Sequence, residues 1–210
     1  MLTKNIYFNN FKLGNKFNKK KKYSIFKKID WFVKFPLLKS YSEKYKYSYS
    51  KSYIKKLKKF RNVNCIGMGG SILGTKAIYN FLQTKIKKNF TFVDNLNPQI
   101  NLKKNGLNII ISKSGETLET ISNLNILLKE KKYKKNIFIS EFTNNNLLKL
   151  AMKLKADIIE HKNYIGGRYS VLSEVGMLPA ELMGLNEKKF KQFNSLIKNK
   201  KFSNQLICNV

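Results

Sequence analysis

The chain has 210 residues, of which 42% are hydrophobic, and this is enough for one medium-sized domain with a buried core. Its 42 lysines and arginines outnumber its 12 acidic residues and give a formal net charge of +30, which ordinarily suggests a nucleic-acid partner. Two cysteines, no apolar run of membrane-spanning length and no signal core argue against a disulfide-rich, metal-binding or membrane protein, so we expect a cytoplasmic protein, with a transit-type extension as the minor alternative.

The positive charge is concentrated in residues 1–60, where 18 lysines accompany only two acids, Asp30 and Glu43. Forty of the 42 basic residues are lysines, and lysine, asparagine and isoleucine together are what an AT-rich genome encodes. No zinc-ligand spacing, RNP-type sequence or helix-turn-helix accompanies the charge. We expect nonspecific polyanion binding at low salt as a side effect, and a basic nucleic-acid-binding protein is kept as an alternative function.

Residues 1–60 are expected to form a basic N-terminal helical extension ahead of the main domain. Tyrosines alternate with lysines in its second half, at Tyr41, Tyr45, Tyr47, Tyr49 and Tyr53. Such a pattern occurs on surfaces that stack bases, but tyrosines more often cover the outer side of a helix, and we favour this second interpretation. The spacing of apolar side chains predicts a helix over residues 52–60.

From residue 61 to residue 186, short apolar runs alternate with segments of helical spacing. We expect strands at 63–66, 90–94, 107–111, 136–140 and 157–159, and helices at 72–82, 121–128, 147–154 and 174–185. This alternation predicts an α/β fold, a doubly wound parallel sheet of about five strands with helices on both faces. Residues 187–210 are expected to form a C-terminal polar helix and a tail.

Two unusual loops follow strand carboxyl ends, where doubly wound sheets bind their ligands. The first, 67–71, reads Gly-Met-Gly-Gly-Ser, and the second, 112–120, reads Ser-Lys-Ser-Gly-Glu-Thr-Leu-Glu-Thr. In the second loop, hydroxyls and the unpaired N–H groups at the start of a helix have the chemistry of an anion site, and Gly115 would let a ligand approach the backbone. Ordinary helix capping by Ser114 and Thr117 is the alternative.

A third loop, 166–170, reads Gly-Gly-Arg-Tyr-Ser and follows the fifth expected strand. Its Arg168 is one of only two arginines in a chain that otherwise uses lysine. A guanidinium supplies a fixed planar fork for oxyanions, whereas an ammonium is a point charge, so Arg168 is predicted to be kept for its geometry. The alternative is a structural arginine that bonds loop carbonyl groups.

Taken together, the three loops resemble the glucose-6-phosphate isomerase family. The resembling segments are Gly67-Met68-Gly69-Gly70-Ser71-Ile72-Leu73-Gly74, the nine residues of the second loop, and Gly167-Arg168-Tyr169-Ser170-Val171-Leu172-Ser173 followed by Val175-Gly176-Met177-Leu178-Pro179. They occur in the family's order over residues 64–184. The resemblance implies the sugar isomerase (SIS) fold and the interconversion of glucose 6-phosphate and fructose 6-phosphate through an enediolate.

The resemblance also implies roles for the residues at matching positions. The phosphate of a hexose phosphate would be bound by Ser112, Lys113, Ser114 and Thr117. Gly70 and Ser71 would contact the sugar, and Glu119 would lie beside the site. Arg168 would be the catalytic residue that faces the reacting C1–C2 region, where it would stabilise developing charge. No metal or organic cofactor is implied, and full-length members of the family are expected to form homodimers.

One part of the family's pattern has no counterpart in this sequence. In the family, the carboxylate base lies in a later segment, and a histidine and a lysine that assist ring opening follow it. His161, the only histidine, precedes the arginine and is predicted to have a solvated or capping role. We therefore expect the chain to correspond to the N-terminal half of the enzyme, as a fragment, a frameshifted copy or a piece that needs a partner chain. A non-catalytic SIS module that binds a phosphosugar is the alternative function.

Overall fold

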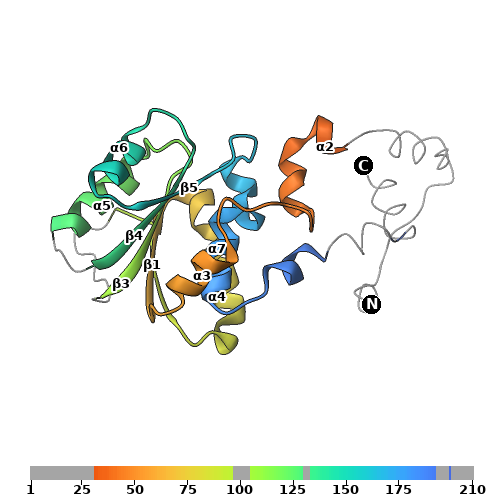
Figure 1. Ribbon diagram of the computed structural model, residues 1–210, viewed down its shortest axis with the longest axis horizontal. Coiled ribbons are helices and arrows are strands. Elements are labelled where there is room, and N and C mark those ends of the chain that lie inside the picture. Colours follow the sequence, from red (N-terminus) through yellow and green to blue (C-terminus); the bar gives the residue numbers. More distant parts are fainter. Residues whose placement is uncertain (1–30, 97–104, 130–132, 193–198, 200–210) are drawn as a thin grey trace. The chain divides into compact units, whose positions relative to one another are not determined.

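The computed structural model describes residues 31–96, 105–129, 133–192 and 199 (Figure 1). The described residues divide between two compact units, of which Tyr45–Glu187 form the larger, and the smaller falls within Met1–Lys44 and Lys188–Val210. The larger unit contains every strand of the described chain and the three loops singled out in the sequence. It begins at Tyr45, ahead of residue 61, where the composition changes.

Five parallel strands form one sheet in the larger unit. They are β1 (Asn62–Gly67), β2 (Asn89–Val93), β3 (Gly106–Ile111), β4 (Tyr133–Ser140) and β5 (Asp157–Glu160). Their order across the sheet is β2-β1-β3-β4-β5, so the chain first adds β2 on one side of β1 and then adds β3, β4 and β5 on the other. The predicted doubly wound parallel sheet is confirmed, and its switch point lies between β1 and β3.

Helices cover both faces of this sheet, as the sequence predicts. They are α3 (Lys51–Leu57), α4 (Leu73–Leu82), α5 (Leu118–Lys129), α6 (Asn146–Lys153) and α7 (Glu174–Leu182), with the short 3₁₀ helices η3 (Gly69–Ser71), η4 (Gln83–Lys85) and η5 (Gly167–Leu172). Figure 1 shows α5 and α6 on one face and α3, α4 and α7 on the other.

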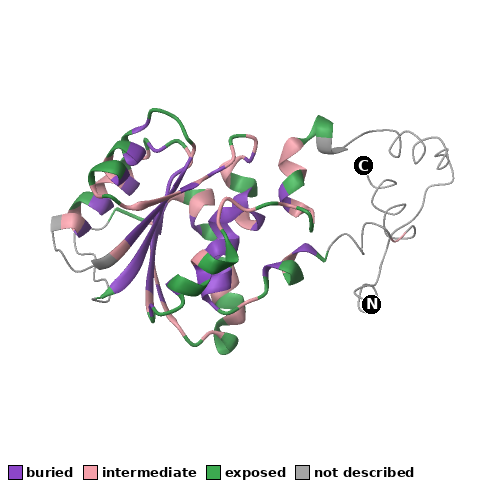
Figure 2. Ribbon diagram, in the orientation of Figure 1, coloured by how far each residue is buried: buried purple, intermediate pink, exposed green. Residues whose placement is uncertain are grey.

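Each face of the sheet has its own hydrophobic core. Side chains of β3 alternate between the two: Ile109 and Ile111 belong to the core with residues of α3 and α7, and Ile110 belongs to the core with residues of α5 and α6. All three isoleucines are fully buried. Figure 2 shows the buried residues along the strands and the exposed residues on the outer sides of the helices. The continuous apolar run in the sequence is therefore that of a strand covered on both sides.

Helix α3 lies within the lysine-rich segment that the sequence pattern assigns to an extension. Its Ile54 and Leu57 are 2% and 3% exposed and belong to the same core as α7. The hydroxyl of Ser50 accepts a hydrogen bond from the backbone N–H of Tyr53 at 3.1 Å and so caps the first turn. The larger unit thus takes part of its core from the lysine-rich segment.

Directly ahead of α3, residues 42–50 are not helical, and two of their tyrosines bond to carboxylates of α7. The hydroxyl of Tyr45 donates to Glu174 at 2.9 Å, and the hydroxyl of Tyr49 donates to Glu181 at 2.9 Å. Both glutamates are buried. The prediction that these tyrosines cover the outer side of a helix is therefore wrong here, because they satisfy buried carboxylates at long sequence separation.

The smaller unit contains two short helical elements, α2 (Trp31–Lys34) and the 3₁₀ helix η2 (Pro36–Tyr41), in agreement with a helical extension. Pro36 lies at the first position of η2, where a missing N–H group leaves no hydrogen bond unmade. The predicted C-terminal helix is described only as the 3₁₀ turn η6 (Glu187–Lys191); residues 1–30, 193–198 and 200–210 lie outside the described residues. Within the described ranges, no helix has the length and apolar character needed to cross a bilayer.

Candidate functional site

Three loops lie at the carboxyl edge of the sheet: the glycine loop (67–71), the serine loop (112–120) and the arginine loop (166–170). The first two follow β1 and β3, on either side of the switch point. Gly67 ends β1 and pairs with Ile111, which ends β3. A Cβ atom on Gly67 would lie 2.8 Å from the carbonyl oxygen of Ile111, so the glycine allows this close approach. The glycine loop and the serine loop therefore start side by side.

The arginine loop contacts the glycine loop directly. A Cβ atom on Gly70 would lie 2.3 Å from the carbonyl oxygen of Gly167, so the two backbones touch at a position that only glycine can occupy. The hydroxyl of Ser170 donates to the carbonyl oxygens of Gly167 at 2.7 Å and Gly70 at 3.2 Å. The backbone of Gly70, predicted to contact a sugar, thus lies against the backbone that carries Arg168.

Lys113 connects the serine loop to the segment that leads into the arginine loop. Its Nζ donates to the carbonyl oxygen of Asn163 at 2.9 Å and forms an ion pair with Glu141 at 3.1 Å. The lysine side chain is 30% exposed, so its charge is partly screened by the carboxylate and partly open to solvent. This bond ties the serine loop to the residues just ahead of the arginine loop, at the same edge of the sheet.

Two hydroxyls of the serine loop lie at the start of α5. The Oγ of Ser112 and the Oγ1 of Thr117 are 2.9 Å apart, and the N–H of Gly115 donates to Ser112 Oγ at 3.2 Å. The carbonyl oxygen of Thr117 accepts the N–H of Ile121 at 3.0 Å, so this residue directly precedes the 12-residue helix α5. The free N–H groups of its first turn and the adjacent hydroxyls are the groups that bind anions at helix N-termini.

Ser114 does not cap α5, as the alternative interpretation required. Its Oγ accepts the N–H of Glu116 at 3.2 Å, inside the loop and ahead of the helix. Ser114 is exposed, and its hydroxyl is near the surface of the loop. The capping interpretation therefore holds at most for Thr117.

Gly115 adopts a φ of +68°, and the group that approaches it is the side chain of Asn145. A Cβ atom here would lie 2.0 Å from Asn145 Oδ1, so the glycine makes room for this side chain and not for a ligand, which corrects the expectation from sequence. Asn145 caps α6, accepting the N–H of Leu148 at 2.9 Å, and Glu116 accepts the N–H of Asn146 at 2.7 Å.

Sequence patterns alone did not single out Asn145 or Glu116, although both hold the serine loop in place. An asparagine directly ahead of a helical apolar run is a helix-start signal, and this signal was present at Asn145. No local sequence pattern predicts that the Asn145 side chain also fills the space beside Gly115, because the two residues are 30 positions apart. Both are supporting residues beneath the loop.

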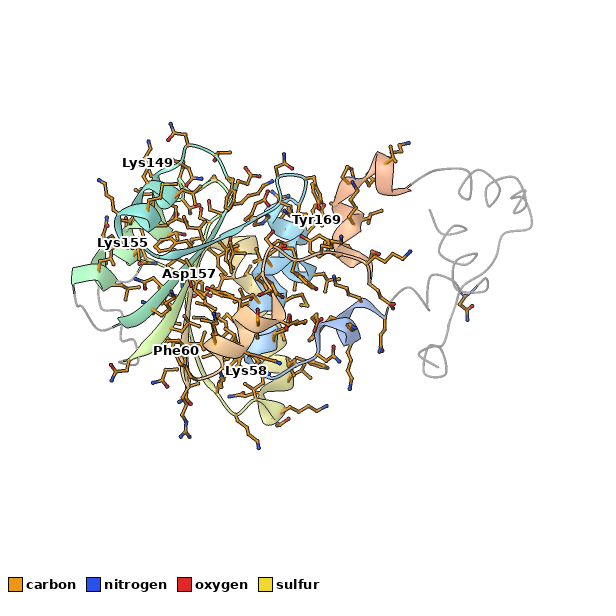
Figure 3. The ribbon with its side chains drawn as sticks, in the orientation of Figure 1. Lys58, Phe60, Lys149, Lys155, Asp157 and Tyr169 are labelled. Carbon is orange, nitrogen blue, oxygen red and sulfur yellow. The ribbon has the colours of Figure 1, made fainter. Side chains whose placement is uncertain are left out.

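Three polar side chains remain available at this edge, one on each loop. Ser71 ends η3, Glu119 lies in the first turn of α5, and Arg168 lies on η5. Among the residues that the structure describes, none of these three side chains makes a hydrogen bond or an ion pair. Arg168 is exposed, as is its neighbour Tyr169 at 52% (Figure 3), so the alternative of a structural arginine bonded to loop carbonyls is not what the described chain shows.

His161 lies buried at the carboxyl end of β5 and is 1% exposed, so the prediction of a solvated role is wrong. Its Nδ1 lies 3.1 Å from the carbonyl oxygen of Lys162, and its Nε2 has no partner in the described part of the chain. Burial lowers the pKa of His161 and outweighs the opposing effects of the hydrogen bond with the Lys162 backbone and of the charges of Glu174 and Glu141. The charge of Lys113 lowers this pKa further. The imidazole is therefore neutral at neutral pH.

Comparison with known proteins decides the family. The family model for phosphoglucose isomerase matches residues 34–204, most of the chain. The chain belongs to the phosphoglucose isomerase family. Among curated members, the glucose-6-phosphate isomerase of Methanocaldococcus jannaschii is 41% identical over 146 aligned positions, which cover 64% of this chain and 36% of the relative. That of Borreliella afzelii is 38% identical over 141 positions, covering 58% of this chain and 26% of the relative.

The chain thus spans about a quarter to a third of the length of these two curated phosphoglucose isomerases. Solved structures share the fold at low identity. A hypothetical protein from Thermus thermophilus superimposes with a TM-score of 0.63 at 18% identity, over 91% of this chain and 50% of that one. A tagatose-6-phosphate ketose/aldose isomerase from Escherichia coli gives a TM-score of 0.51 at 13% identity, over 86% of this chain and 51% of that one.

Proposed function

We propose that this chain provides the phosphate-binding and arginine-bearing part of an active site that interconverts glucose 6-phosphate and fructose 6-phosphate. One observation carries the proposal: the backbone of Gly70 touches Gly167 beside the β1–β3 switch point, so loops far apart in sequence share one edge. Ligands of doubly wound sheets bind at this place. The names of the curated relatives support the hexose phosphate as the substrate.

In this proposal, the serine loop binds the phosphate. Ser112 and Thr117 supply hydroxyl donors, the first turn of α5 supplies backbone N–H groups, and Ser114 adds an exposed hydroxyl. Lys113 attracts the dianion from the side of the arginine loop while Glu141 and Asn163 hold its ammonium. Hydrogen bonds to a charged group are stronger than those between neutral groups, so each hydroxyl contributes about 1–3 kcal/mol to binding.

The sugar would lie between the glycine loop and the arginine loop. Gly70 and Ser71 contact it, the first through its backbone and the second through a hydroxyl that is free within the described chain. Arg168 faces the reacting carbons, where an enediolate places negative charge on oxygen. A guanidinium already in position stabilises that charge without reorganisation. Glu119 lies beside the site, and the proposal assigns the proton transfer between C1 and C2 to no residue of this chain.

Arg168, whose guanidinium has no partner among the described residues, favours an isomerase over a module that only binds a phosphosugar, since binding a phosphate needs no group at the reacting carbons. A basic nucleic-acid-binding protein would leave the carboxyl edge without a function. Homodimer formation, expected from the family, belongs to the same proposal and is tested by sedimentation velocity of the full chain.

A thermal-shift series with the full chain tests the proposal. Glucose 6-phosphate and fructose 6-phosphate should raise the melting temperature in a saturable way, because a ligand that binds only the folded state stabilises it by mass action. Inorganic phosphate at the same concentration, the control, should raise it less. A coupled assay then measures isomerisation. No shift with either sugar phosphate contradicts the proposal, and a shift without turnover supports phosphosugar binding but contradicts isomerisation by this chain alone.

A further inference from the structure

A cavity lies at the edge of the sheet opposite the three loops, where the parallel strands begin. Its volume is about 620 Å³, within the range of small-molecule sites. It is lined by Lys59, Phe60, Arg61, Asn62, Asn105 and Lys135. These residues come from the turn between α3 and β1, from the position before β3 and from β4. Because all strands run parallel, this cavity is separated from the three loops by the length of the sheet.

Among the residues that the structure describes, the lining contains three cations and no carboxylate. Lys135 forms an ion pair with Asp157 at 2.8 Å, and Asp157 also accepts the hydroxyl of Tyr53 at 2.7 Å, so this lysine is neutralised. The ammonium of Lys59 lies 5.5 Å from the ring centroid of Phe60 and makes no ion pair within the described ranges. The guanidinium of Arg61 is exposed and has neither a hydrogen bond nor an ion pair to any described residue.

These cations are not used to stabilise the end of α3. Lys88 stabilises it instead: its Nζ donates to the carbonyl oxygen of Lys58, the C-cap of α3, at 2.9 Å. The pKa of Lys88 is lowered first by burial and then by the nearby charge of Lys58. Figure 3 shows Lys58 and Phe60 close together at this edge. Lys59 and Arg61 therefore line the cavity without an ion-pair partner among the described residues.

We propose that this cavity binds a small oligophosphate anion, at a site independent of the sugar phosphate site. Arg61 supplies the planar fork that matches two phosphate oxygens, and it is one of only two arginines among 42 basic residues. Lys59 supplies a second positive charge, whereas the charge of Lys135 is already offset by Asp157. An oligophosphate carries several negative charges over a short distance, which suits an arginine and a lysine gathered in one concave site.

Isothermal titration of the full chain with inorganic tripolyphosphate in 150 mM NaCl tests this proposal. We expect saturable binding to the wild type. Arg61→Ala should bind about tenfold more weakly, which is the loss of about 1.4 kcal/mol expected for a charge-assisted contact. Lys149→Ala is the matched control, because it removes one exposed charge from α6, away from the cavity (Figure 3), and it should bind like the wild type.

Arg168→Ala distinguishes the two edges of the sheet, because it removes the other arginine. It should leave the Arg61-dependent binding of tripolyphosphate unchanged, whereas Arg61→Ala should leave the thermal shift with fructose 6-phosphate unchanged. Equal weakening by Arg61→Ala and Lys149→Ala would mean nonspecific attraction to the net charge and would overturn the proposal, as would no binding to the wild type. A failure of the tripolyphosphate proposal can therefore be told apart from a failure of the sugar phosphate proposal.

Discussion

Gly115 fixes the shape of the serine loop through two separate constraints. Its φ of +68° lies in the left-handed region, and the space beside its Cα is filled by Asn145. Gly69 on the glycine loop shares the first constraint, with a φ of +52°, but nothing lies within 4 Å of where its Cβ would be. An alanine at Gly69 would therefore meet only backbone strain, whereas an alanine at Gly115 would meet both backbone strain and a steric clash with Asn145.

We predict that Gly115→Ala destabilises the fold more than Gly69→Ala. The control substitution should cost only the strain of a left-handed alanine, about 1 kcal/mol. Gly115→Ala should cost about 1–3 kcal/mol more, because a methyl group displaces the residue that caps α6. Urea unfolding followed by circular dichroism measures both. Equal losses would show that Asn145 can move aside without consequence.

His161 predicts a pH dependence of stability that one substitution should remove. Its folded-state pKa is lowered by burial, whereas in the unfolded chain it is near 6.5. The unfolded state therefore binds more protons as the pH falls below about 6.5, and stability decreases in that range. As the chain has a single histidine, His161→Asn should flatten the change in urea midpoint between pH 7.5 and 5.5. An unchanged slope would mean that the imidazole protonates freely in the fold.

At the scale of elements, three strands of the sheet are joined by a row of buried asparagines. Asn64 of β1, Asn108 of β3 and Asn136 of β4 are register partners, and each is at most 7% exposed. Asn64 Nδ2 donates to Asn108 Oδ1 at 2.8 Å, and Asn108 Nδ2 donates to Asn136 Oδ1 at 3.0 Å. A slip of one residue would break this row, so it helps to fix the register.

Removing the middle asparagine should therefore be costly. Asn108→Ala leaves the side-chain Nδ2 of Asn64 and the side-chain Oδ1 of Asn136 buried without these hydrogen bonds. We therefore expect a loss of about 2–4 kcal/mol in the free energy of unfolding. Asn89→Ala is the control, since it removes one similar bond, to Asn62 at 3.0 Å, on the half-buried edge strand. It should cost less than half as much. Similar losses for both would show that the buried row adds nothing beyond a surface bond.

The contact between the extended segment and α7 gives a second prediction for elements. Tyr45→Phe removes the hydroxyl that donates to both oxygens of Glu174 at 2.9 and 3.0 Å, so this fully buried carboxylate keeps the N–H of Ser48 as its other donor. We expect a loss of about 1–3 kcal/mol in urea unfolding. Tyr79→Phe makes the same chemical change where the ring packs against Phe90 and should be nearly neutral. A neutral Tyr45→Phe would contradict this account.

For the whole molecule, the sequence was most informative where the signal is local. Each β-branched run between helical segments became a strand, and because the strands are parallel, their loops had to meet at one edge. The strand order β2-β1-β3-β4-β5 could not be predicted from the sequence, since it depends on which strands pair with one another. The contacts of Asn145 with Gly115 and of Tyr45 with Glu174 were missed for the same reason: the partners lie far apart in the chain, and the local patterns around them do not predict which residues meet.

If the three loops form one site for a hexose phosphate, a single titration series should show that each of them contributes to binding. Binding of fructose 6-phosphate is measured by calorimetry for this chain and for Ser71→Ala, Ser112→Ala and Arg168→Ala, one variant for each loop. The account predicts one saturable site, weakened in all three by about 1–3 kcal/mol and unchanged in Lys149→Ala. Weakening by Ser112→Ala alone, with Ser71→Ala and Arg168→Ala binding like the wild type, would contradict it.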